Sequence, residues 1–154
     1  MTIYSMKKIL SVCISLFAFL NVFCQAHNPV QWVATYKSIS DTEGEIKITG
    51  VIEKGWHTYS QQANNAVPLP TLISFKESKK YQLLGKVEEK NAHEEYDAAL
   101  GEKLLVFVEK AEFIQKVKLK GKAPQTILFK VEYIVCDNKM CMPPTTIDLS
   151  VNIH

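Results

Sequence analysis

The stretch TILFKVEYIV, residues 126–135, alternates apolar and polar side chains along most of its length. Lys130 and Glu132 occupy polar positions that lie between apolar ones. Because successive side chains of a strand point to opposite faces of a sheet, this period of two predicts a half-buried antiparallel β-strand. The side chains predicted to face the core are Ile127, Phe129, Val131, Tyr133 and Val135.

The rest of the chain repeats this pattern in short runs bounded by Gly, Pro, Asn or Asp. The best candidate for a helix, Glu88–Leu100, carries charges on every side and is interpreted as a loop with at most one helical turn. About nine short strands in a chain of this size predict an all-β fold, an immunoglobulin-like two-sheet antiparallel β-sandwich. The other predicted strands are Val30–Tyr36, Glu45–Ile52, Trp56–Ser60, Leu72–Phe75, Tyr81–Lys86, Lys103–Glu109, Glu112–Lys120 and Thr146–Ile153.

The N-terminal segment, residues 1–26, has the composition of a secretory signal peptide. Two lysines precede an apolar run, Ile9–Phe23, and small residues then stand at both positions that a signal peptidase inspects, in Cys24-Gln25-Ala26. The run has 15 residues, whereas about 20 are needed to span a bilayer, so cleavage is favoured over a membrane anchor. The bulky residue before Cys24 disfavours lipid attachment there. We therefore expect export of one soluble domain, residues 27–154, to the periplasm.

The charge of the exported part argues against nucleic acid as a partner. The whole chain has 18 basic and 16 acidic residues, and loss of Lys7 and Lys8 with the signal peptide leaves 16 of each. Every basic side chain apart from histidine is a lysine, so the flat guanidinium groups that recognise phosphate through two parallel hydrogen bonds are absent from the sequence. We expect partners to be selected by shape and by local groups, not by long-range electrostatic attraction.

Two of the four cysteines lie in the signal peptide, which leaves Cys136 and Cys141 in the exported domain. They flank a polar turn and are close enough in sequence for a disulfide to be geometrically reasonable. Closing so short a loop stabilises a fold little, while Pro143 and Pro144 hold the backbone that follows and suit a bond that is made and broken. Spacing alone favours a structural and a redox interpretation equally. By parity with the polar positions of the preceding strand, the sulfur of Cys136 is expected on the more accessible face.

Two segments carry a resemblance to a known family. The run VEYIVCDNKMCMPPTT, residues 131–146, resembles the active-site segment of the N-terminal periplasmic domain of DsbD, the thiol:disulfide interchange protein, where a cysteine pair is likewise followed by two prolines. Upstream, KGWHTYSQ, residues 54–61, with VPLP, residues 67–70, is similar to an aromatic strand and a following proline of the same family. The motifs occur in the family's order, and the resemblance covers most of residues 30–153.

The resemblance implies an immunoglobulin-like electron carrier of the protein-disulfide reductase type, with a redox-active Cys136–Cys141 disulfide and no other cofactor. In the family the second cysteine forms the mixed disulfide with partners and the first resolves it, which implies Cys141 as the attacking thiol and Cys136 as the resolver. The implied partners are thioredoxin-like oxidoreductases or disulfide isomerases. Proteins of this family continue into a membrane domain and a thioredoxin-like domain, whereas this sequence is similar to the N-terminal part alone. We therefore expect a stand-alone module that is supplied by a separate membrane electron donor.

His57 and Tyr59 match two family positions beside the cysteine pair that are tyrosines there, so His57 is a departure from the family. Its imidazole has two interpretations of equal weight. It is either a half-buried side chain with a satisfied hydrogen bond or a group that shifts the pKa of a nearby thiol.

The family also carries an acidic loop that caps the cysteines, and the segment around Glu94, Glu95 and Asp97 occupies its place. Carboxylates there would raise the pKa of a thiol and slow its exchange with random disulfides. The aromatic residue that covers the disulfide in the family is replaced by Ala99 or Leu100, and Tyr96 is the candidate substitute. The alternative interpretation of the acidic residues is a solvated surface loop.

Four sulfur-bearing side chains, Cys136, Met140, Cys141 and Met142, support an alternative function. Thiolate and thioether sulfurs suit Cu(I), so an exported copper-binding or copper-delivery sandwich would use the same atoms. Methionines more often fill gaps or lie at interaction surfaces, which favours packing over ligation. Zinc is disfavoured because two cysteines and one distant histidine leave its four-ligand shell incomplete. A structural sandwich that binds protein through a sheet edge is the remaining alternative.

Overall fold

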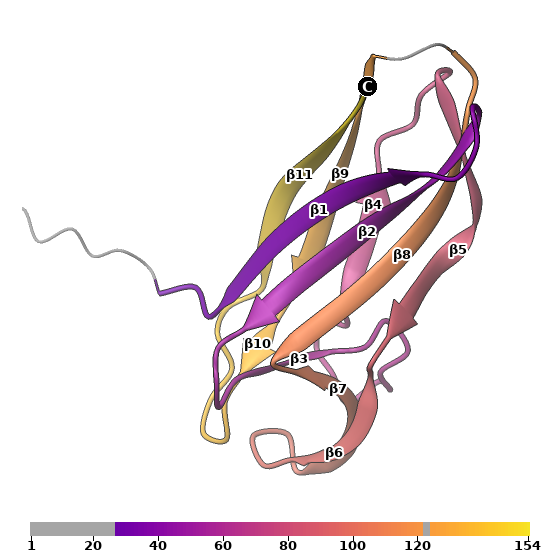
Figure 1. Ribbon diagram of the computed structural model, residues 1–154. Coiled ribbons are helices and arrows are strands. Elements are labelled where there is room, and N and C mark those ends of the chain that lie inside the picture. Colours follow the sequence, from indigo (N-terminus) through magenta and orange to yellow (C-terminus); the bar gives the residue numbers. More distant parts are fainter. Residues whose placement is uncertain (1–26, 122–123) are drawn as a thin grey trace, which may run out of the picture.

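The computed structural model describes residues 27–121 and 124–154, and this part of the chain consists of antiparallel strands and turns with no helix (Figure 1). The predicted signal peptide lies outside the described residues. The all-β prediction is confirmed, and every predicted strand is present with small differences in its bounds. The strands are β1 Val30–Ser38, β2 Glu43–Ile52, β3 His57–Tyr59, β4 Leu72–Phe75, β5 Tyr81–Lys90, β6 His93–Asp97, β7 Glu102–Val108, β8 Lys110–Leu119, β9 Gln125–Tyr133, β10 Val135–Cys136 and β11 Thr145–Ile153.

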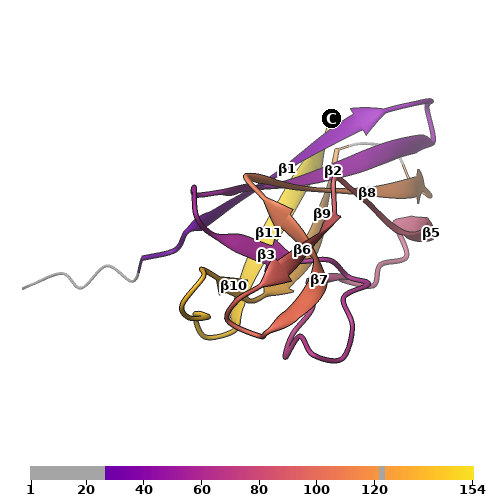
Figure 2. The ribbon, with the colours of Figure 1, turned by 90° about the horizontal axis from the view of Figure 1, so that it is seen from below.

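The strands form three hydrogen-bonded sheets. β1-β2-β8-β5 and β11-β9-β4 are the two layers of the sandwich, and β1 lies alongside β11 where the layers approach each other (Figure 1). β10-β3-β7-β6 forms a third sheet at one end of the two layers, as the view from below in Figure 2 also shows. We call it the end sheet. The immunoglobulin-like sandwich is therefore present, and the end sheet carries the first cysteine of the pair.

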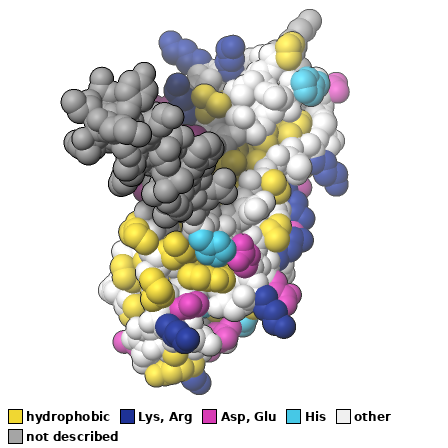
Figure 3. All heavy atoms as spheres, turned by 90° about the vertical axis from the view of Figure 1, so that its left-hand side faces the viewer, with side chains coloured by type: hydrophobic (Ala, Val, Ile, Leu, Met, Phe, Trp, Pro, Cys, Tyr) yellow, Lys and Arg dark blue, Asp and Glu magenta, His cyan; other side chains and the backbone are white. Residues whose placement is uncertain are grey.

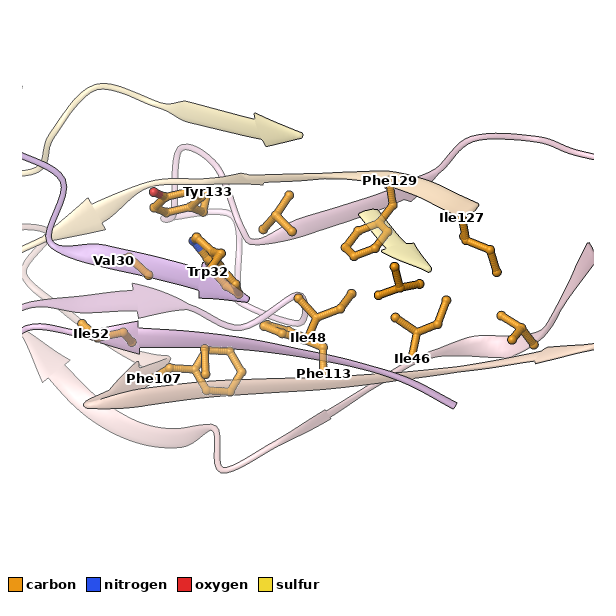
Figure 4. Close-up of a cluster of buried hydrophobic side chains, with 14 of the residues drawn as sticks. Val30, Trp32, Ile46, Ile48, Ile52, Phe107, Phe113, Ile127, Phe129 and Tyr133 are labelled. Carbon is orange, nitrogen blue, oxygen red and sulfur yellow. The ribbon is translucent and has the colours of Figure 1, made fainter. Parts of the chain in front are cut away.

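Alternating burial along the strands builds the main core between the two layers. Ile127, Phe129 and Val131 of β9 are buried, and the residues between them are exposed. Ile46 and Ile48 of β2 face them from the opposite layer (Figure 4). Each fully buried aliphatic or aromatic side chain contributes about 1.5–3 kcal/mol relative to an exposed one. The stretch whose pattern predicted the fold thus supplies the inner face of one layer.

Four aromatic rings connect the three sheets. Trp32 of β1 lies with its ring centroid 5.4 Å from that of Tyr133 in β9 and 6.0 Å from that of Phe113 in β8. Phe113 in turn lies 5.2 Å from Phe107 of β7, which belongs to the end sheet. Aromatic pairs at these separations add stabilisation beyond that of their buried area. The end sheet is therefore fixed to the main core by ring packing.

The interpretation of Glu88–Leu100 as a loop is wrong, because most of this segment belongs to β5 and β6 and only residues 98–101 form a turn. The pairing of β5 with β8 shifts register between Leu84 and Glu88, and an irregularity of this kind interrupts the period of two. β6 is an edge strand with four exposed residues. It therefore shows no apolar face from which a strand could be predicted.

The prediction that the sulfur of Cys136 lies on the more accessible face is also wrong, since Cys136 is fully buried. β9 ends at Tyr133, and the chain then passes to the end sheet, where β10 pairs with β3. The alternation of faces holds only within one strand, so parity cannot be counted across Ile134. Ile134, Val135 and Cys136 are all buried in succession.

We expect Phe113→Ala to lower the free energy of unfolding by about 3–5 kcal/mol, because it removes a ring that touches two other rings in the core. Urea unfolding followed by tryptophan fluorescence measures this change. Val33→Ala is the control, because Val33 is 54% exposed on β1 and its truncation should cost no more than about 0.5 kcal/mol. Equal losses in the two variants would contradict the described packing.

Candidate redox site

Cys136 and Cys141 form a disulfide at the end of the molecule that carries the end sheet. Their Cα atoms are 4.0 Å apart, and the two residues form an isolated β-bridge. The amide of Asp137 donates to the carbonyl oxygen of Met140 at 2.9 Å, and the Asp137 carboxylate accepts from the amides of Lys139 and Met140 at 2.8 Å each. These two hydrogen bonds from backbone amides lower the pKa of the Asp137 carboxyl below its ordinary value. The loop between the cysteines is thus held by its own hydrogen bonds as well as by the disulfide.

The two cysteines differ in exposure. Cys136 has an exposed fraction of 0%, whereas Cys141 is half-buried. Cys136 belongs to a small apolar cluster, distinct from the main core, that includes Tyr59, Leu104 and Val106, and Cys141 packs against this cluster. An incoming thiolate can therefore reach the disulfide from the side of Cys141, while Cys136 is shielded by the fold.

Three polar side chains form a connected group next to Cys136. β3 supplies His57 and Tyr59, and the last position of β6 supplies Asp97. Tyr59 Oη lies 3.0 Å from Cys136 Sγ and donates a hydrogen bond to Asp97 Oδ2. His57 Nε2 lies 3.1 Å from the same carboxylate oxygen and 3.3 Å from Tyr59 Oη. Since all these residues are buried, the contacts form a polar chain from the disulfide to the imidazole.

The Asp97 carboxylate is the acceptor that organises this group. Oδ1 accepts hydrogen bonds from the amides of Ala99 and Leu100 at 2.8 Å and 3.0 Å, and Oδ2 contacts Tyr59 and His57. Burial by itself would raise the pKa of Asp97, but the hydrogen bonds from Tyr59, from the Leu100 amide and from His57 outweigh it and lower the pKa below its ordinary value. Asp97 is therefore a buried carboxylate that remains ionised at neutral pH.

Tyr59 has one hydroxyl proton and two acceptors within reach. Burial, followed by the hydrogen bond to Asp97 and the charge of Asp97, raises the pKa of Tyr59 far above its ordinary value. The phenol is therefore neutral at any pH at which the protein works. Because a hydroxyl proton can rotate, Tyr59 can direct it to Asp97 while the disulfide is intact and to the sulfur when Cys136 carries a charge.

The other residues predicted for an acidic cap do not join this group. Glu94, Glu95 and Tyr96 are exposed on β6, Tyr96 to 61%. Glu95 forms an ion pair at 3.4 Å with His93 on the same strand. Glu95 shares a face of β6 with Asp97, because side chains two positions apart in a strand point the same way, but Asp97 alone among these four acidic or aromatic residues is buried. Glu94, Glu95 and Tyr96 therefore lie on the solvated surface, and of the acidic residues predicted for the cap only Asp97 belongs to the site.

The residues around Cys141 are more exposed than those around Cys136. Met140 is 57% exposed, and Pro143 and Pro144 are exposed between Cys141 and β11. Met142 packs against the main core. The methionine sulfurs predicted for Cu(I) therefore lie in different environments, and their arrangement does not favour the copper alternative.

Leu100 is a residue of the site that the sequence analysis did not assign a role. It is half-buried and packs against the cluster that contains Cys136. The sequence signal that could have indicated its position is Asp97-Ala-Ala-Leu-Gly101. An aspartate that accepts hydrogen bonds from the amides of the residues after it, followed by a glycine at positive φ, forms a tight turn. This turn brings the Leu100 side chain against the apolar cluster that contains Cys136.

Comparison with known proteins identifies the family. The family model described as "Thiol:disulfide interchange protein DsbD, N-terminal" matches residues 27–152. The chain belongs to this family. The expected resemblance is thereby confirmed over nearly the whole described domain. Curated protein sequences gave no match.

Two solved N-terminal domains have the same fold as this chain. The N-terminal domain of DsbD from Neisseria meningitidis, in its reduced form, superposes with a TM-score of 0.55 at 14% sequence identity, covering 84% of this chain and 91% of that one. The N-terminal periplasmic domain of ScsB from Proteus mirabilis superposes with a TM-score of 0.53 at 15% identity over 79% of this chain. This chain spans 44% of the length of that ScsB structure.

The described residues, 27–121 and 124–154, contain neither a candidate metal site nor a candidate membrane-spanning helix. In this part of the chain no three His, Cys, Asp or Glu side chains are grouped so that they could hold a metal ion. No helix in the same residues is long and apolar enough to cross a membrane.

We expect Asp97→Asn to lower the free energy of unfolding at pH 7 by about 1–3 kcal/mol, because it disturbs a buried acceptor of four hydrogen bonds. Because the pKa of Asp97 is lowered in the folded protein, its ionised form stabilises the fold above the ordinary aspartate pKa of about 4, and this stabilisation is lost as the pH falls below that value. The deficit of the variant should therefore shrink between pH 7 and about pH 3.

Urea unfolding at a series of pH values measures this dependence. Glu94→Gln is the matched control, since it removes an exposed carboxylate from the same strand and should change stability by no more than about 0.5 kcal/mol. A deficit for Asp97→Asn that does not vary with pH would show that the carboxylate is not ionised in the folded protein.

Proposed function

We propose that this protein is an exported thiol–disulfide exchange module that passes electrons through the Cys136/Cys141 pair to or from partner oxidoreductases. The observation that carries the proposal is the asymmetry of the disulfide. One cysteine is half-buried at the surface, and the other is fully buried with Tyr59 3.0 Å from its sulfur. A disulfide that only staples a loop needs no polar chain behind one sulfur. Membership of the DsbD N-terminal family supports the same chemistry.

In the reducing direction, a thiolate of a donor dithiol attacks Cys141 Sγ. The bond between the two cysteines breaks, and Cys136 leaves as a thiolate that accepts a hydrogen bond from Tyr59. The second thiolate of the donor then attacks the donor sulfur of the mixed disulfide, and Cys141 leaves as a thiolate. Two electrons have passed to the pair, and the donor is oxidised to a disulfide.

In the oxidising direction, the Cys141 thiolate attacks a client disulfide, and one client sulfur leaves as a thiolate. The Cys136 thiolate then attacks Cys141 Sγ and releases the second client sulfur. Exposure supports this division of roles, since the residue that meets the client is the half-buried Cys141 and the resolving Cys136 never has to leave the apolar cluster.

The backbone around the pair supports repeated exchange. The Asp137 hydrogen bonds hold the loop on one side of Cys141, and on the other side the amide of Met142 donates to the carbonyl oxygen of Val135 at 2.9 Å. These contacts do not depend on the sulfur–sulfur bond. We expect the loop to keep its shape in the reduced form, so that the sulfurs change partner without large backbone movement.

We propose thioredoxin-like oxidoreductases or disulfide isomerases as partners and a separate membrane protein as the electron donor. Apolar side chains gather on the face of the molecule that carries the loop between β10 and β11 (Figure 3). Met140, Pro143 and Pro144 are exposed there and offer a partner contact area around Cys141. The family and the predicted signal peptide support a periplasmic location for these encounters.

The proposal predicts that Cys136→Ala forms a persistent mixed disulfide through Cys141, because its resolving thiol is absent. Cys141→Ala is the matched control and should be trapped far more slowly, since its remaining thiol is buried. Each purified variant is incubated with a thioredoxin-like protein whose second active-site cysteine is replaced by alanine and whose first carries a 5-thio-2-nitrobenzoate leaving group, so that the partner cannot resolve the mixed disulfide. Intact-mass analysis without reductant then measures the trapped fraction. The wild-type pair should equilibrate with glutathione, which gives its reduction potential.

A reduction potential well below about −300 mV, in the range of inert structural disulfides, together with no mixed disulfide for Cys136→Ala, would contradict the redox function. Faster trapping of Cys141→Ala than of Cys136→Ala would instead reverse the proposed roles of the two cysteines.

A further inference from the structure

His57 is a buried titratable side chain that the exchange steps do not use. Its side chain is 11% exposed, and its ring stands edge-on to that of Tyr59 with the centroids 5.4 Å apart. Nε2 is the atom that approaches both Tyr59 Oη and Asp97 Oδ2. The imidazole is therefore separated from Cys136 Sγ by one phenol group.

When the disulfide opens, Cys136 becomes a thiolate that protonation would stabilise. The sulfur leaves as a thiolate inside an apolar cluster and close to the carboxylate of Asp97, and an uncompensated buried charge is strongly unfavourable. Tyr59 can give its proton to this sulfur across 3.0 Å. A phenolate would then be left in contact with Asp97, so Tyr59 must be reprotonated as it gives its proton away. His57 Nε2, 3.3 Å from the phenol oxygen, is placed to do this.

We propose that His57, acting through Tyr59, supplies the proton that Cys136 takes up when the disulfide is reduced and accepts it again when the disulfide re-forms. The inference rests on the proposed exchange function. In the reducing step, the donor sulfur bonds to Cys141 Sγ, and the electron pair of the broken bond stays on Cys136 Sγ. The Tyr59 proton moves to that sulfur, and the Nε2 proton of the imidazolium moves to Tyr59 Oη. His57 is left neutral until it takes a proton from solvent.

The surroundings of His57 fit this role. Asp97 Oδ2 accepts from both the phenol and the imidazole and so holds the two groups in contact with each other. The titratable groups that act on His57 are Tyr59 on its own strand, Asp97 on β6, and Asp137, which follows β10 and interacts with the imidazole through its charge. Cys136 faces His57 in the register of β10 with β3. His57 is a positioning residue, and Tyr59 is the group that touches the reacting sulfur.

Reduction of the disulfide by dithiothreitol between about pH 5 and pH 8 tests the inference, because an imidazole titrates in this range. Each rate constant is divided by the concentration of dithiothreitol thiolate, which removes the titration of the reagent. For the wild-type protein we expect this normalised rate constant to rise as the pH falls. For His57→Gln, which can hydrogen-bond but cannot supply a proton, we expect no rise. We expect its rate constant at pH 6 to be about 100-fold lower, at the modest end of the range for loss of general acid catalysis.

His93→Gln is the matched control, because it removes an exposed histidine of β6 and should keep the wild-type profile. Tyr59→Phe provides a second test that retains His57 and breaks the connection to the sulfur, and its profile should also be flat. A wild-type pH profile in His57→Gln or in Tyr59→Phe would overturn the inference and leave the exchange function standing. Failure of the wild-type pair to exchange with dithiothreitol at any pH would overturn both.

Discussion

The pairing of β10 with β3 is the contact on which the site depends. Two residues of β10 suffice to bring Cys136 within 3.0 Å of Tyr59, although these residues lie 77 positions apart in the chain. The hydroxyl of Thr58 donates to the carbonyl oxygen of Ile134 at 2.8 Å and fixes the point where the chain leaves β9 for the end sheet. Without this pairing the two cysteines would close a surface loop away from Tyr59, His57 and Asp97, and one sulfur would not be shielded.

The site also depends on the buried carboxylate of Asp97, which holds Tyr59 and His57 in place. An ionised group inside an apolar cluster is tolerated because two amides, a phenol and an imidazole satisfy its oxygens. Hydrogen bonds in such surroundings are strong and hold their members in one arrangement. Because β6 is an exposed edge strand up to its last residue, Asp97 is its single contribution to the site. The redox pair is thus built on rigid strands, with its reactive face on a loop.

Much of this architecture could be predicted from local patterns, and the errors have a common cause. The alternation in β9 and β2 identified strands whose inner faces form the core. The same criterion did not predict β6, which is exposed on both faces, or the second half of β5, where a register shift interrupts the period of two. It also failed at Cys136, because the strand that predicted its face ends at Tyr133. Among the candidate site residues, Asp97 and Glu94 could not be separated by sequence, since both are acidic residues of one short strand.

The sequence by itself determined the all-β class, the isolated cysteine pair followed by two prolines, and the two motifs that place the chain in the DsbD N-terminal family. Periodicity and motif order are local properties, so they can be read along the chain. The tertiary structure alone decided which cysteine is buried and which side chains stand behind it. These contacts join β3, β6 and β10, and they depend on which strands pair in the end sheet, a choice that rests on hydrogen bonds and packing between segments far apart in sequence.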